Sequence, residues 1–162
     1  MSLKHLLLAA AALGAGCGSS TSAGLAEYSQ LTLQLSSAVA AHRDAGTSVS
    51  SVSDCTSEHA NYDGHARPLV EQMLSISGQM DSCMMGLGNA ALANFQRTCR
   101  SMISELDSHA QKACQSSTMS QDWSETVRDC DAMDAFIQRE QSGEDTMSNM
   151  MRGMMTSGAC HP

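Results

Sequence analysis

The sequence predicts an all-α protein, an up-down-up-down four-helix bundle stapled by disulfides. Apolar residues recur at alternating steps of three and four in four successive stretches, the spacing that keeps one stripe of a helix facing its neighbours. Hydrophobic residues make up 42% of the 162 residues but aromatic ones only 3%, so the 13 methionines must help to fill an aliphatic core. This shortage of aromatic and β-branched residues disfavours a β-sandwich.

The N-terminal segment, residues 1–16, differs from the rest of the chain. It begins with a short basic stretch containing Lys4, continues with an apolar run ending at Leu13, and closes on small residues directly before Cys17. The apolar run is far too short to span a bilayer. A charged start, a short apolar run and small residues are typical of a secretory signal peptide.

With Cys17 following the small residues, this segment resembles the signal peptide of a bacterial lipoprotein, in which cleavage before a cysteine is coupled to its lipidation. The resemblance covers only residues 1–20 and implies that Cys17 becomes the lipidated N-terminus. Residues 17–24, rich in Gly, Ser, Thr and Ala, would then form a flexible tether. Gly14 stands where the family usually has Leu, and ordinary cleavage after Ala23 is the alternative.

The first two helices are predicted from two long apolar stripes. The first stripe comprises Tyr28, Leu31, Leu35, Ala38, His42, Ala45, Val49 and Val52, and the second Cys55, His59, Tyr62, Ala66, Leu69, Met73, Ile76, Met80, Cys83 and Leu87. Gly46 predicts that the first helix ends near Ala45, and Asp54 is the expected N-cap of the second. Residues 61–68 contain Gly64 and Pro68 and read as a turn, but the unbroken stripe favours one helix kinked there.

The third and fourth stripes complete a bundle domain spanning residues 25–155, with residues 156–162 as a C-terminal tail. The third stripe comprises Leu92, Phe95, Cys99, Met102, Leu106, His109 and Ala113, and the fourth Met119, Trp123, Val127, Cys130, Met133, Ile137, Glu140, Glu144, Met147 and Met151. Thr118 and Gln121 have the spacing of a capping box before the fourth helix. The acidic residues early in this helix are expected to form a solvated face: Asp122, Glu125, Asp129, Asp131 and Asp134.

Six cysteines follow Cys17, and an even number outside the cytoplasm favours disulfides. Antiparallel neighbouring helices bring helix ends together, which predicts the pairs Cys55–Cys114 and Cys83–Cys160. Cys99 and Cys130 then remain, both at mid-height on neighbouring helices, and are the third expected pair. A thiolate metal site is the alternative, although the sequence contains no Cys-x-x-Cys motif.

Three stripe positions hold histidine: His42, His59 and His109. Counted at about 1.5 Å per residue, all three lie within roughly two turns of the same end of the bundle. Imidazoles converging from three helices predict a transition-metal site, for copper or zinc above all. Neighbouring residues expected to act as a fourth ligand or as hydrogen-bond acceptors are Glu58, Tyr62, Glu105 and Glu125. The alternative is that these histidines are hydrogen-bonded core residues that specify helix register.

A second candidate metal site lies in the methionine-rich end of the chain. Its expected ligands are Met147, Met150, Met151, Met154, Met155 and His161. Thioethers are soft ligands suited to Cu⁺. The alternative is that methionines fill irregular gaps at the end of the bundle.

Composition narrows the function. A net charge of −8 with only 9 Lys and Arg residues disfavours a nucleic-acid partner. The sequence lacks the nucleophile, phosphate-loop and dinucleotide motifs of common enzyme classes, which favours a non-enzymatic protein. We therefore expect a lipoprotein of the bacterial cell envelope, anchored through an N-terminal lipid and facing the periplasm or cell surface, that binds copper or zinc. The alternative is a structural or adaptor lipoprotein that binds an envelope protein.

Overall fold

The computed structural model describes the backbone of residues 17–83 and 89–156. Within these ranges the side chains outside the description are those of 17–22, 81–83, 89, 91, 150, 151 and 153–156. The chain forms four helices: α1 (Cys17–Ala45), α2 (Val52–Cys83), α3 (Asn89–Lys112) and α4 (Met119–Thr156). The described residues contain no strand, so the predicted all-α fold is confirmed.

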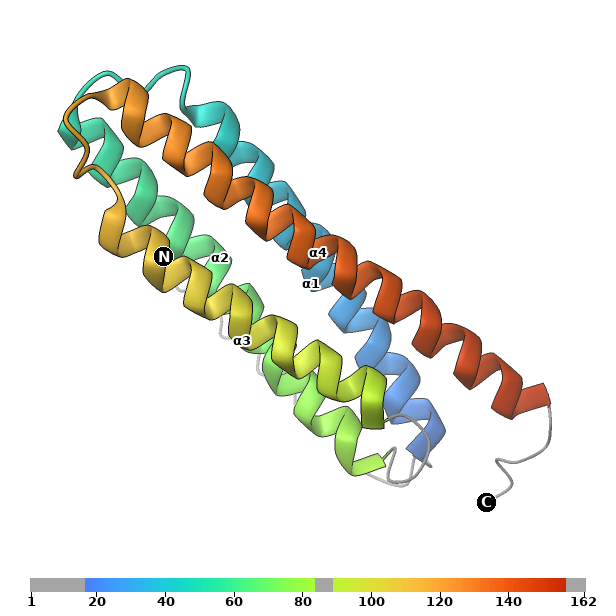
Figure 1. Cartoon of the computed structure of the whole chain (residues 1–162). Helices are drawn as coiled ribbons and strands as arrows, with labels where there is room; N and C mark the ends of the chain where they lie inside the picture. Colours follow the sequence, from blue (N-terminus) through green and yellow to red (C-terminus); the bar gives the residue numbers. More distant parts are fainter. Residues whose placement is uncertain (1–16, 84–88, 157–162) are drawn as a thin grey trace, which may run out of the picture.

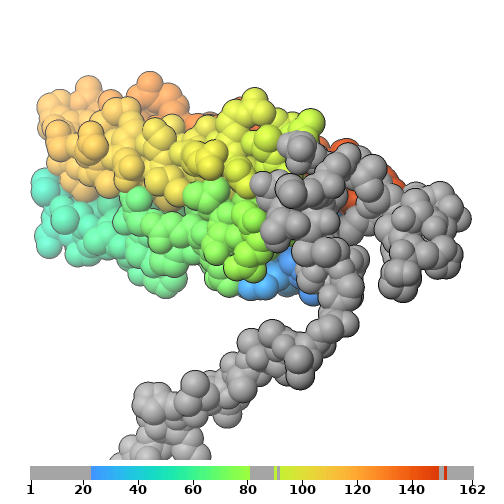
Figure 2. Space-filling view, turned by 90° about the horizontal axis from the view of Figure 1, so that it is seen from below, coloured from blue at the N-terminus to red at the C-terminus, as the bar shows by residue number. Residues whose placement is uncertain are grey.

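The helices form an up-down-up-down bundle (Figure 1). Each packs against the next along the chain, and α4 returns to pack against α1. The α1–α2 and α3–α4 connections lie at the same end of the bundle (Figure 1). Figure 2 shows α2 and α3 side by side along one face of an elongated molecule. Among the described residues, no helix combines the length and the apolar character that crossing a membrane requires.

The start of α1 corrects the predicted tether, because residues 17–24 are helical. Leu25 is buried, and Gly24 lies so close to α2 that an added Cβ would stand 3.3 Å from Met80 Cγ. These contacts hold the helix near its first turns, and extending an existing helix upstream is easier than nucleating one.

As predicted, α1 ends at Ala45. The predicted cap of α4 is also present, because the Thr118 hydroxyl oxygen accepts the Gln121 N–H at 3.3 Å. Asp54 as the N-cap of α2 is wrong. Ser51 Oγ accepts the Asp54 N–H at 3.1 Å, so Ser51 is the N-cap and Asp54 lies in the first turn. As predicted, α2 is one helix, with Pro68 inside it.

The core is aliphatic and methionine-rich, with one aromatic pair across the bundle. The Tyr28 and Phe95 rings stack with centroids 4.8 Å apart. Gly143 on α4 makes room for this pair, since an added Cβ would stand 2.3 Å from Phe95 Cε1. Phe95 is buried and packed against Tyr28, so its ring has little freedom to move away.

We predict that Gly143→Ala lowers the free energy of unfolding by about 1–3 kcal/mol, because overpacking outweighs the gain in helix propensity. Gly78→Ala is the matched control, because nothing lies within 4 Å of the added Cβ. It should raise the free energy of unfolding by up to about 1 kcal/mol. Urea denaturation of both variants measures these changes, and equal effects from both would contradict the packing argument.

Candidate metal centre

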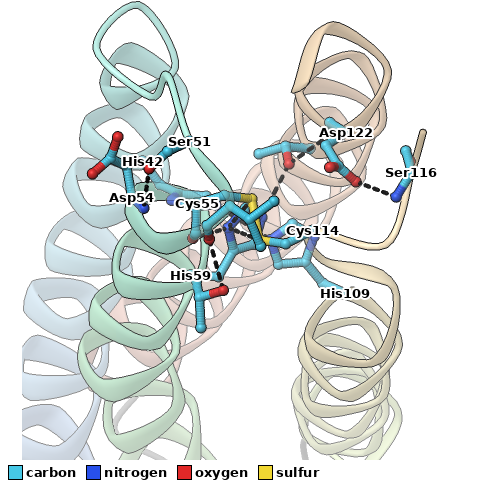
Figure 3. Close-up of a disulfide and its surroundings, with 12 residues drawn as sticks. His42, Ser51, Asp54, Cys55, His59, His109, Cys114, Ser116 and Asp122 are labelled. Atoms are coloured by element: carbon cyan, nitrogen blue, oxygen red, sulfur yellow. Dashed lines mark hydrogen bonds between the residues drawn. A yellow bond between two sulfur atoms is a disulfide. The ribbon is translucent and has the colours of Figure 1, made fainter. Parts of the chain in front are cut away.

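The three stripe histidines meet at the end of the bundle that carries the α1–α2 and α3–α4 connections (Figure 3). His42 lies in the last turn of α1, His59 near the start of α2 and His109 in the last turn of α3. One ring nitrogen of each lies within 4.8 Å of the other two. Their exposed fractions are 1%, 6% and 6%, so the layer is an interior one. We call these three residues the His layer.

Each imidazole of the His layer is held through its Nδ1 atom. His42 Nδ1 lies 3.1 Å from Glu58 Oε1, and His109 Nδ1 lies 2.8 Å from Asp129 Oδ2. His59 Nδ1 lies 2.8 Å from the carbonyl oxygen of Cys55. These oxygen atoms accept hydrogen bonds, so in the neutral rings Nδ1 carries the proton and Nε2 the lone pair. Histidines that bind metals are oriented in the same way, by an acceptor at the second nitrogen.

The Nε2 atoms of His42 and His109 face each other at 3.2 Å. When both rings are neutral and donate their Nδ1 protons to these carboxylates, neither Nε2 has a hydrogen to offer the other, and two lone pairs oppose each other. A cation bound between them satisfies both. In a tetrahedral zinc site with Zn–N bonds of about 2.0–2.1 Å, neighbouring nitrogens lie about 3.3 Å apart. The observed spacing therefore fits a shared ion.

Burial favours the neutral form of His42 and His59. Burial, together with the nearby His59 and His109, lowers the pKa of His42 to about 3. Burial also lowers the pKa of His59, opposed by its hydrogen bond to the Cys55 carbonyl. Neutral imidazole is the form that ligates metal ions.

Aromatic rings enclose the His layer. The Tyr62 ring stacks on His42 with centroids 4.1 Å apart and an interplanar angle of 4°. The Trp123 ring lies 5.6 Å from that of His42 and 6.0 Å from that of His59. Gly46 lets the indole approach, since an added Cβ would overlap the indole ring. Trp123 therefore covers the layer at the end of the bundle.

The predicted disulfide Cys55–Cys114 is present, with an S–S distance of 2.07 Å, and joins the start of α2 to the segment after α3 (Figure 3). Cys114 has a left-handed backbone conformation, with φ of 61°, which is one way in which helices end. The predicted pair Cys83–Cys160 lies outside the described residues.

The predicted pair Cys99–Cys130 is wrong, because both are free and buried. Phe95 on α3 contacts Gly143 on α4, so Cys99, four residues later, lies level with a residue four before Gly143. That level is more than two turns, about 13 Å, from Cys130. Asp129, well inside α4, hydrogen-bonds to His109 near the end of α3, so α4 begins about two turns beyond the end of α3. Because of this offset, positions at mid-height of the two helices, which the prediction paired, do not lie at the same level.

Of the four residues expected to support the His layer, two contact His42 and two do not. Glu58 and Tyr62 contact His42 as described above, whereas Glu125 forms an ion pair with Arg128 at 3.7 Å. Glu105 is half-buried and lines a small void beside His109.

The solvated acidic face predicted for α4 is wrong in part, because Asp129 binds His109 and Asp122 is only 3% exposed. Thr126 is also buried, and its Oγ1 lies 3.1 Å from His59 Nε2. Sequence reasoning missed these three. The one available signal was their helical spacing, which places Asp122, Thr126 and Asp129 along one side of α4.

The methionine-rich candidate site is placed only at its first member. Met147 is fully buried in the apolar core cluster, among hydrophobic side chains. Met150, Met151, Met154 and Met155 belong to α4, but their side chains lie outside the described part of the chain, as does His161.

No protein-family model, curated protein or solved structure matches this chain.

A second buried polar cluster lies in the other half of the core, between α1, α3 and α4. The Tyr28 hydroxyl donates to Glu140 Oε2 at 2.6 Å and lies 3.2 Å from Cys99 Sγ. Thr32 donates to Glu144 Oε1 at 2.7 Å. Glu140 Oε1 is buried without a hydrogen-bond partner among the described residues. Burial raises the pKa of Glu140 to about 7, although the Tyr28 hydrogen bond acts in the opposite direction.

We predict that Glu140 makes the bundle less stable as the pH rises. The folded protein holds this proton up to about pH 7, whereas the unfolded chain releases it near the ordinary pKa of 4.5. The free energy of unfolding should therefore fall between these values, by up to about 1.4 kcal/mol per pH unit. Glu140→Gln should flatten that slope relative to wild type, and the exposed Glu71→Gln should leave it unchanged. Urea denaturation across this pH range measures both, and an unchanged slope in Glu140→Gln would refute the assignment.

Proposed function

We propose that this protein binds a divalent transition-metal ion, copper or zinc, through Nε2 of His42, His59 and His109. The observation that carries the proposal is the pair of Nε2 atoms 3.2 Å apart whose rings already donate their Nδ1 protons elsewhere. Core histidines that only specify register are expected to hydrogen-bond to each other or to the backbone, not to face lone pair to lone pair.

The donor set indicates the class of metal. Imidazole nitrogens suit Zn²⁺ and Cu²⁺, and the general order of divalent affinities places Cu²⁺ above Zn²⁺. Three protein ligands leave a fourth position for water or another donor. Glu58 and Asp129 supply negative charge next to the ring nitrogens, which makes the imidazoles better ligands. Enclosure by Tyr62 and Trp123 suits storage or transfer of an ion rather than turnover of a substrate.

We also propose that the bundle is a lipoprotein of the bacterial cell envelope, anchored by lipid on Cys17. The support is the charged, apolar and small-residue pattern that precedes this cysteine. A lipid anchor would hold the metal site at the membrane surface, in a compartment where disulfides such as Cys55–Cys114 persist.

The metal proposal predicts that the oxidised mature protein takes up one equivalent of Zn²⁺ or Cu²⁺. The ion should raise the free energy of unfolding with the logarithm of its concentration above the Kd, by about 2.7 kcal/mol at 100 times the Kd, and the melting temperature should rise with it. The single tryptophan, Trp123, should report binding as a change in fluorescence. Isothermal titration calorimetry gives the stoichiometry and the affinity.

The triple variant His42→Leu, His59→Leu and His109→Leu should lose the uptake, the thermal shift and the fluorescence change. His65→Leu is the matched control, because His65 is exposed on α2 and bonds only to the Asn61 carbonyl among the described residues. Wild-type protein that binds neither ion at micromolar concentration would end the proposal and favour the adaptor alternative.

The anchor predicts that Cys17→Ser releases the protein from the membrane fraction of a bacterial host. Without the thiol, a lipid has no attachment point. Fractionation followed by mass spectrometry of the mature N-terminus checks both the location and the cleavage site. A Cys17→Ser protein that stays with the membrane, or a wild-type chain beginning at Gly24, would contradict the lipoprotein assignment.

A further inference from the structure

The disulfide and the His layer share one residue. His59 Nδ1 lies 3.7 Å from Cys55 Sγ and 3.7 Å from Cys114 Sγ. The two sulfurs and this nitrogen lie within 4.8 Å of one another, as do the nitrogens of the His layer. His59 therefore belongs to both clusters of metal-ligating atoms (Figure 3).

The spacing in the sulfur cluster is close to that of a tetrahedral zinc site. With Zn–S bonds of about 2.3 Å and Zn–N bonds of about 2.05 Å, neighbouring N and S ligands lie about 3.6 Å apart. The corresponding S···S spacing is about 3.8 Å. The two sulfurs are now joined in a disulfide. When that bond is broken, the sulfurs must separate to non-bonded contact, which is the spacing that the metal requires.

An unsatisfied carboxylate lies at the same corner of the bundle. Asp122 is 3% exposed, and its Oδ1 accepts the Ser116 N–H at 2.9 Å. Its Oδ2 is buried with no hydrogen-bond partner in the described part of the chain. Figure 3 shows Asp122 beside the Cys114 segment, and its charge acts on His59. A cation next to the sulfurs would neutralise this buried charge.

We propose that reduction of Cys55–Cys114 converts the disulfide into a metal-thiolate site made of Cys55, Cys114 and His59, with Asp122 balancing its charge. The class of ion is a thiophilic divalent one such as Zn²⁺. A dithiol reductant supplies the two electrons: its sulfurs displace the two cysteine sulfurs in turn and leave as a cyclic disulfide, and each cysteine takes up one proton. Metal binding then releases those two protons as both thiols become thiolates, and the oxidation state of the metal does not change.

The switch requires a proton to move on His59. In the disulfide form Nδ1 donates to the Cys55 carbonyl at 2.8 Å, so it must give up this proton to bind metal. The proton has a place at Nε2, because Thr126 Oγ1 lies 3.1 Å away and itself donates to the Asp122 carbonyl. This site goes beyond the proposed function, and it does not require that the His layer bind metal.

The experiment uses the mature chain carrying His42→Gln and His109→Gln, which dismantles the His layer but keeps His59. With Zn²⁺ as the probe, the oxidised variant should bind no ion, and the variant reduced by dithiothreitol, with the reductant then removed, should bind one tight equivalent. Co²⁺ in place of Zn²⁺ should give the near-ultraviolet charge-transfer absorption of a thiolate ligand. Adding Cys55→Ser and Cys114→Ser should abolish both signals. Reduced protein that takes up no more Zn²⁺ than oxidised protein would overturn the proposal.

The control variant adds Cys99→Ser and Cys130→Ser instead, and it should keep the zinc. These thiols lie in the core away from the cluster, and burial raises their pKa to about 12 and about 11, which disfavours thiolates. A second measurement does not depend on variant folding: in reduced wild-type protein, Zn²⁺ should protect Cys55 and Cys114 from alkylation, mapped by mass spectrometry. Protection of other cysteines, with these two still reactive, would refute the site. Failure of zinc uptake by oxidised wild type affects only the His layer.

Discussion

One end of the bundle is organised around two imidazole nitrogens that oppose each other in a buried layer. His42 and His109 approach to 3.2 Å at Nε2 because carboxylates on α2 and α4 hold both rings from behind. Burying polar groups without partners costs free energy. At this end of the bundle, features other than apolar packing hold the helices together. A disulfide joins α2 to the end of α3, and Trp123 lies over the rings in the space left by Gly46. Each of these features is explained by the need to hold three histidines in one place.

The other half of the bundle has an apolar core, whose burial stabilises the fold that holds the His layer in place. Its core is a continuous cluster of Leu, Met, Val and Ile side chains around the stacked Tyr28 and Phe95. With only 3% aromatic residues, the chain relies on aliphatic and methionine packing to fill space between long helices. Even here the core holds Glu140 under the Tyr28 hydroxyl, so polar groups are admitted where a neighbouring helix offers a partner.

Helical periodicity was enough to predict the fold and the His layer, because three-four spacing and a fixed rise per residue determine both the face and the height of a side chain. The same reasoning found Cys55–Cys114, whose members lie at helix ends that the topology must bring together. It failed where the relative slide of α3 and α4 mattered, as at Cys99 and Cys130, since no local pattern encodes that slide. It also failed at Asp122, Thr126 and Asp129, because residue type alone does not distinguish a polar side chain that faces the bundle interior from one that faces solvent.

His59 connects the two candidate sites and limits how they can act together. A neutral imidazole has one lone pair, so it can bind an ion through Nε2 toward the His layer or through Nδ1 toward the sulfurs, but not both at once. The hydrogen bond from Nδ1 to the Cys55 carbonyl selects the first state while the disulfide is intact. Breaking the disulfide leaves two thiols on the Nδ1 side, and on the proposed mechanism their conversion to metal-bound thiolates would draw the ring into the second state. That withdrawal leaves His42 and His109 as a two-ligand site, which holds an ion less tightly than three. If both proposed sites bind metal, the redox state of one disulfide is coupled to the affinity of the His layer through the tautomer of a single ring.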